Sequence, residues 1–204
     1  MRGMAEDLPL FKQNHGFSCG PASLLMVMGS LDRNLILDGS LEMSLWEDAN
    51  LGESKATSSY GLALAALKRG FGARVYANGE GIGFVGRLVK HFPRIDAKKM
   101  DQHYQRSKSK ARELGVEEVE KKVGLEEIST ELEKGVNPMI LISSRMMGEI
   151  IGIPHWVVLT RVSKEEVHLV NPEWATRESY THKRFLKHLG WGDQTRMVCV
   201  FGLE

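Results

Sequence analysis

The order of its hydrophobic patterns constrains this chain most, because helix-like patterns come first and strand-like patterns come last. Segments 22–29, 41–50 and 60–69 carry apolar residues in patterns typical of helices. From residue 136 onward, short runs rich in valine and isoleucine indicate strands. Since helices and strands that are segregated along a chain pack as two regions, this order predicts an α+β fold, with a helical half packed on an antiparallel β-sheet half.

The remaining segments complete the expected architecture. Small and polar residues predict a loop at 52–59, and dense Lys, Arg and Glu predict a charged helical insertion at about 95–123. The length of 204 residues suits one domain, so we expect a single domain over 1–204. Strands are predicted at 73–77, 136–143, 157–162, 167–170 and 197–203, and further helices at 84–91, 125–134 and 185–189.

The composition limits which partners and which cellular location we expect for this protein. The hydrophobic fraction of 42% and the charged fraction of 26% are ordinary for a globular protein. The formal net charge of +1 offers no basic surplus, so we expect neither nucleic acid nor an anionic membrane as a partner. Apolar runs such as 139–142 are too short to span a bilayer, and residues 1–10 lack the apolar stretch of a signal peptide. We therefore expect a cytoplasmic protein, whose oligomeric state the sequence does not predict.

The two cysteines have different contexts. Cys199 lies in an apolar strand pattern and is expected in the core, and two cysteines make no disulfide framework. Cys19 precedes a helical pattern, with Ser18 as a candidate N-cap and Pro21 suited to the first turn. Because the amides and the dipole at a helix N-terminus stabilise an anion, Cys19 is the candidate nucleophile. Gly20 beside it is expected to let a substrate backbone approach closely.

Acyl transfer by a cysteine also needs a base, a group that orients the base, and donors for the oxyanion. His155 opens a strand and is the candidate base, while Asn171 ends the next strand and could accept from its ring. Gln13, in the extended lead-in, could supply an amide donor beside the sulfur. His155 and Asn171 share a face of the hairpin only if its pairing offset is even. We therefore predict an odd-numbered loop or a bulge near 163–166.

Other candidate sites have weaker support. Trp156 and Trp174 flank the expected site and are candidates for a substrate groove, with core packing as the alternative for each. Histidines and cysteines show no zinc-ligand spacing, and the glycines at 79–86 lack a following Gly-Lys-Ser/Thr, so we expect no metal and no cofactor. The basic run within 98–112 is interpreted as a solvated face, with an acidic partner or substrate as the alternative.

Three motifs resemble the bacteriocin-processing, double-glycine leader peptidase family of the papain-like clan. They are QNHGFSCGPASLLM at 13–26, PHWVVL at 154–159, and the pair Asn171-Pro172. The resemblance implies a papain-like cysteine peptidase fold, with Cys19 as nucleophile, His155 as base, Asn171 orienting the base and Gln13 in the oxyanion hole. The family commonly has Asp at the third position and is usually fused to a membrane transporter, so the chemistry transfers better than the substrate does.

Together these patterns predict a cysteine peptidase that hydrolyses a peptide or peptide-like amide through a thioester, with a peptide or protein as substrate. Two alternatives stay open. In a transpeptidase or amidase of the same clan, an amine would intercept the thioester or the substrate would be a small amide. In a catalytically silent binding module the fold would persist without turnover, although the complete residue set argues against this.

Overall fold

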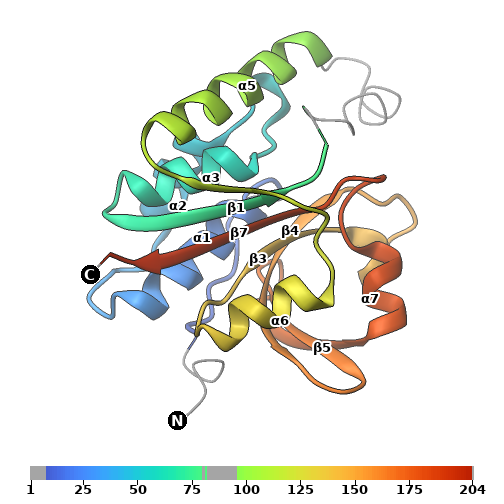
Figure 1. The fold of residues 1–204 in the computed structure, drawn as a ribbon. Coiled ribbons are helices and arrows are strands. Elements are labelled where there is room, and N and C mark those ends of the chain that lie inside the picture. Colours follow the sequence, from blue (N-terminus) through green and yellow to red (C-terminus); the bar gives the residue numbers. More distant parts are fainter. Residues whose placement is uncertain (1–7, 80, 82–95, 204) are drawn as a thin grey trace.

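The computed structural model describes residues 8–79, 81 and 96–203. The strands of this part of the chain form a mixed seven-stranded sheet (Figure 1). The strand order is β2-β1-β7-β3-β4-β5-β6. Every neighbouring pair is antiparallel except β1 and β2, which run parallel. The expected antiparallel sheet therefore needs a correction at this edge. The strands are β1 (Phe71–Ala77), β2 (Glu117–Glu120), β3 (Met139–Ser143), β4 (Pro154–Val162), β5 (Glu166–Asn171), β6 (Thr176–Thr181) and β7 (Arg196–Gly202).

Helices cover both faces of the sheet (Figure 1). One apolar cluster joins side chains of four helices, α1, α2, α3 and α5, to one face of the strands, and a second cluster joins side chains of α6 and α7 to the other face. The helices are α1 (Cys19–Leu31), α2 (Gly39–Ala49), α3 (Ser59–Leu67), α5 (Ala97–Glu113), α6 (Leu125–Glu133) and α7 (His182–His188), with 3₁₀ turns η2 (Gly52–Ser54) and η3 (Ser144–Met147). Among the residues described, no helix is both long and apolar enough to cross a membrane.

Strand β4 shows how the two clusters share one sheet. Trp156 and Val158 belong to the cluster under α1, whereas Val157 and Leu159 belong to the cluster under α6 and α7. Successive side chains of a strand point to opposite faces, so a continuous apolar run is what a strand buried on both sides requires. The α+β architecture predicted from the element order is confirmed.

The charged segment after residue 95 differs from its prediction. Helix α5 ends at Glu113, Gly115 follows with φ of +84°, and the chain then enters β2 beside β1. The left-handed backbone at Gly115 ends the helix, because only glycine adopts it without strain. The charged insertion predicted as helical at about 95–123 is therefore helical from Ala97 to Glu113, and the prediction of helix beyond Glu113 was wrong. The predicted helix at 84–91 lies outside the described residues.

Two basic side chains of helix α5 form ion pairs with the neighbouring strand β2. Glu118 of β2 accepts Lys108 Nζ at 3.0 Å and also pairs with Arg112. Tyr60 of α3 donates to the same carboxylate at 2.5 Å. The same helix buries Met100 and other side chains in the core. At Lys108 and Arg112, the basic run thus ties an edge strand to the helical layer.

Candidate active site

Cys19 is the first residue of α1, and its side chain is only 9% exposed. Burial opposes ionisation of the thiol, but the charge of His155, a hydrogen bond from His155 and backbone hydrogen bonds outweigh it, so the pKa of Cys19 lies below its ordinary value. The unpaired amides at the start of α1 favour an anion in the same way. Cys19 therefore occupies the environment of a nucleophilic thiolate.

His155 is the second residue of β4 and is 5% exposed. Burial acts to lower the pKa of its imidazole, but the Cys19 thiolate and the hydrogen bonds to Cys19 and Asn171 raise that pKa above its ordinary value. The two shifts have opposite signs because each charge stabilises the other. The arrangement favours an imidazolium–thiolate pair over two neutral side chains.

Asn171 ends β5, and its contacts assign the protonation of the histidine. Its Nδ2 lies 3.1 Å from Glu178 Oε1, and its Oδ1 lies 3.0 Å from His155 Nε2. A carboxylate only accepts, so the amide nitrogen must face Glu178 and the amide oxygen must face His155. Nε2 then carries the hydrogen, which leaves Nδ1 as the nitrogen that can take the Cys19 proton.

The register of β4 and β5 places this asparagine on the histidine's face. Val162 pairs with Val167 and Val158 pairs with Val170, and the register shifts between Leu159 and Arg161. The four-residue loop has the wrong parity, but the bulge at Thr160 restores the even offset. The structure therefore meets the predicted condition through a bulge, which lies at Thr160, just before the predicted stretch 163–166, and not through an odd-numbered loop.

A buried carboxylate organises the loop before the nucleophile. Glu42 of α2 is 0% exposed and accepts from Ser18 Oγ at 2.6 Å and Asn14 Nδ2 at 2.6 Å. It also accepts the backbone N–H of Asn14 at 3.0 Å. Ser18 directly precedes α1, but its side chain makes no cap hydrogen bond, so the side-chain cap expected from the sequence is not formed. Sequence reasoning missed Glu42 and Glu178, because an acidic residue on a helix or an edge strand normally faces water.

Gln13 lies beside the asparagine. Its backbone N–H donates to the carbonyl of Pro172 at 2.8 Å. The side-chain Nε2 donates to the carbonyl of His15 at 2.9 Å, and Oε1 is buried without a partner among the described residues. The amide thus keeps one N–H for another acceptor. Its role in an oxyanion hole stays a prediction.

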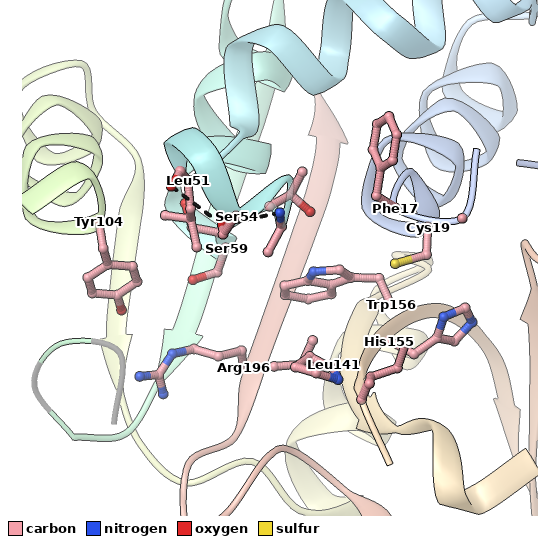
Figure 2. A pocket seen from close by; sticks show the side chains of 16 residues that line it. Phe17, Cys19, Leu51, Ser54, Ser59, Tyr104, Leu141, His155, Trp156 and Arg196 are labelled. Carbon is pink, nitrogen blue, oxygen red and sulfur yellow. Dashed lines mark hydrogen bonds between the residues drawn. The ribbon is translucent and has the colours of Figure 1, made fainter. Parts of the chain in front are cut away.

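A cavity of about 170 Å³ adjoins Cys19 and His155 (Figure 2). Trp156, which is 3% exposed, lines this cavity and also packs in the core, so both of its expected roles coincide. Trp174 is 60% exposed, with Lys12 Nζ 5.5 Å from its ring centroid, and it does not line the cavity. A Cβ at Gly20 would lie 2.4 Å from Thr57 Oγ1. The space beside Gly20 is therefore filled by the protein's own hydroxyl rather than left open to a substrate backbone.

The rest of the described chain adds no further chemistry of this kind. Both cysteines are free, and burial together with the nearby Glu131 raises the pKa of Cys199 well above its ordinary value. The ranges described contain no group of three or more His, Cys, Asp or Glu side chains arranged to hold a metal ion. Cys199 is a core thiol, as predicted, and it serves as an internal comparison for Cys19.

Comparison with known proteins agrees with this architecture. A model described as "Peptidase_C39 like family" matches residues 8–187. A solved double glycine motif protease from an AMS/PCAT transporter, in complex with the leader peptide, aligns with a TM-score of 0.51 over 98% of this chain and 95% of that chain. Its sequence identity is 14%, so the match shows a shared fold alone. The predicted resemblance and fold class are confirmed.

A curated relative covers less of the chain. An uncharacterized protein of Methanothermobacter marburgensis is 42% identical over 74 residues, which is 36% of this chain and 48% of that protein. The chain thus matches about half the length of this relative.

Proposed function

Because this chain belongs to the Peptidase_C39 like family, we propose that it is a cysteine peptidase that works through a thioester on Cys19. One observation carries the proposal: the hydrogen-bonded relay from the half-buried Glu178 through the buried side chains of Asn171 and His155 to Cys19. The relay leaves a single ring nitrogen to face a thiol whose pKa is depressed. A buried structural cysteine would instead have a raised pKa, as Cys199 does.

In the proposed reaction, the Cys19 thiolate attacks the carbonyl carbon of a peptide or peptide-like amide. The N–H of Cys19 and the free N–H of the Gln13 amide are proposed to stabilise the oxyanion, and loss of one such donor typically costs about 100- to 1000-fold in rate. His155 then protonates the leaving amine, and neutral His155 activates the water that hydrolyses the thioester. Asn171 keeps the imidazole in the required tautomer.

The proposed substrate class is a peptide. The solved neighbour with the shared fold is described as a complex with a leader peptide, which makes a leader-type peptide the first substrate to test. Peptide products would distinguish hydrolysis, which releases a free acid, from transpeptidation, which joins the acyl part to an added amine.

The first test measures the rate of Cys19 alkylation by iodoacetamide against pH, followed by mass spectrometry. An ordinary thiol titrates at about pH 8.5. We expect wild-type Cys19 to react rapidly well below that pH and His155→Ala to lose the low-pH reaction, because the imidazolium stabilises the thiolate. Cys199 in the same molecule should stay unmodified, since it is buried and its pKa is raised.

The opposite profile would refute the proposal. If Cys19 reacts only near pH 8.5 and His155→Ala behaves like the wild type, the free protein holds no primed nucleophile. The binding-module interpretation would then replace the peptidase.

A further inference from the structure

The cavity beside Cys19 extends away from the reacting atoms and ends in polar groups. In Figure 2, Cys19 and His155 lie at one end, Trp156 and Leu141 lie between, and Tyr104 and Arg196 lie at the other end. Its volume is about 170 Å³. An engineered protein cavity of roughly 150 Å³ holds benzene, so this space accommodates a side chain of comparable size. We call this space the side pocket, and it has room for a substrate side chain larger than that of glycine.

Two hydroxyl groups in the side pocket lack hydrogen-bond partners. Thr57 is 8% exposed and Ser59 is 2% exposed, and neither hydroxyl has a partner among the described residues. A buried polar group left without a hydrogen-bond partner destabilises the protein. A ligand that brought an acceptor or donor to these hydroxyls would remove that cost. The wall around them is otherwise apolar, with Leu51 and Trp156 on it.

Arg196 adds a positive charge at the far end. It is 3% exposed, and its two terminal nitrogens donate to the carbonyls of Asn78, Thr195 and Gly81 and to Gln194 Oε1, at 2.7 to 3.0 Å. All four acceptors are neutral, and no carboxylate of the described residues forms an ion pair with it. Since its terminal hydrogens are occupied, Arg196 acts on a ligand through its charge rather than as a bidentate clamp.

We propose that the side pocket selects a substrate side chain near the scissile bond that has a short apolar stem and ends in a carboxylate or amide, with glutamate preferred and glutamine next. This inference rests on the proposed function. The stem would contact Leu141 and Trp156, and the end group would pair with the hydroxyls of Thr57 and Ser59. The charge of Arg196 favours the carboxylate and excludes lysine and arginine side chains of a substrate.

The test uses peptidyl chloromethyl ketones, in which the Cys19 sulfur displaces chloride. The residue next to the reactive group, or the one before it, is varied among Glu, Gln, Met, Lys and Gly. The second-order rate of Cys19 alkylation is measured by intact-protein mass spectrometry. At one of the two positions we expect the Glu and Gln reagents to react about tenfold faster than the Met reagent, because the three side chains are similar in size and Met forms no such hydrogen bonds. The Lys reagent should react most slowly.

Variants locate the selectivity in the side pocket. Thr57→Val and Ser59→Ala should reduce the Glu-to-Met rate ratio toward one, because each removes a hydroxyl that pairs with the end group. Ser30→Ala is the matched control, since its hydroxyl already donates to the carbonyl of Val27 at 2.6 Å and does not line the pocket. Its rate ratio should equal that of the wild type.

Two results overturn the inference. Fastest alkylation by the Gly reagents at both positions would mean that no side chain enters the pocket, and equal rates for Lys and Glu would mean that Arg196 exerts no selection. Iodoacetamide separates this failure from failure of the proposed function. If iodoacetamide modifies Cys19 at low pH while the peptidyl reagents do not discriminate, the nucleophile stands and only the side-pocket proposal falls.

Discussion

The buried carboxylate of Glu42 is expected to stabilise the loop before Cys19, and its contribution to the free energy of unfolding can be predicted. Glu42 is fully buried on α2 and accepts from three donors, which are the backbone N–H and side-chain Nδ2 of Asn14 and the hydroxyl of Ser18. None of the ion pairs among the described residues includes Glu42. Replacing Glu42 by Ala would leave both N–H donors of Asn14 without an acceptor and open a void beside them, whereas the Ser18 hydroxyl keeps the carbonyl of His15, at 2.9 Å, as its acceptor.

The expected loss of stability follows from the number of hydrogen bonds that Glu42 accepts. Hydrogen bonds to a charged group are each worth about 1.5–3 kcal/mol, so three of them contribute roughly 5–9 kcal/mol. Burying a carboxylate costs several kcal/mol and offsets much of that contribution. We therefore expect Glu42→Ala to lower the free energy of unfolding by about 2–4 kcal/mol. Glu42→Gln should lose about half as much, because its amide keeps one accepting oxygen and brings a donor toward donors.

Urea denaturation followed by circular dichroism measures these changes. Glu47→Ala is the matched control, because Glu47 lies on the same helix with an exposed side chain and should change stability by less than about 0.5 kcal/mol. The iodoacetamide rate of Cys19 should fall in the Glu42 variants as well, since Ser18 directly precedes it. If Glu42→Ala is as stable as Glu47→Ala, the carboxylate does not hold the loop and the reasoning is refuted.

The remaining predictions concern the relay and the acidic edge of the sheet. Glu178→Ala removes one of the contacts that orient the Asn171 amide, whose Oδ1 also accepts the backbone N–H of Glu173 at 3.0 Å. The pH profile of Cys19 alkylation should therefore move to higher pH and the rate at pH 6 should fall by about tenfold, with Glu178→Gln recovering most of the rate. Coincident profiles would contradict this positioning role. Burial opposes ionisation of Glu118, but hydrogen bonds from Arg112, Tyr60 and Lys108 lower its pKa to about 2. The contribution of Glu118 to stability should therefore be complete above about pH 4.5 and should disappear as the pH falls toward 2, and it should amount to about 1–2 kcal/mol after allowance for solvent screening. Glu118→Gln should unfold at lower urea than the wild type at pH 6 but at the same urea near pH 2, and a constant difference would contradict the assignment.

Local patterns in the sequence were sufficient for the order of elements and for the candidates of the relay. Helices such as α3 and strands such as β4 have apolar patterns that persist whatever packs against them, so their existence was predicted while their ends moved by a few residues. The placement of Cys19 before a helix and of His155 at the start of a strand is also local information. Hairpin parity gave the condition under which Asn171 and His155 share a face, and the structure meets it through the bulge at Thr160.

Tertiary structure decided what depends on contacts between distant segments. Strand β6 has exposed residues on both faces and no apolar alternation, and it forms because β5 offers it a partner edge. Strand β2 likewise depends on β1, whose paired residues lie 43 positions earlier in the chain, as in the pair Tyr76–Val119. No local pattern in a stretch of charged residues records which neighbouring strand it will meet.

The functional details that the sequence did not determine have the same cause. Glu42 became an acceptor for the nucleophile loop only through burial between α2 and residues 14–18, and Thr57 filled the space beside Gly20 only because α3 packs on α1. The side pocket is bounded by segments from residue 16 to residue 196. Residue type and spacing along the chain determined which groups could perform the chemistry, whereas packing alone decided which groups surround them, because burial and hydrogen bonding are set by neighbours in space.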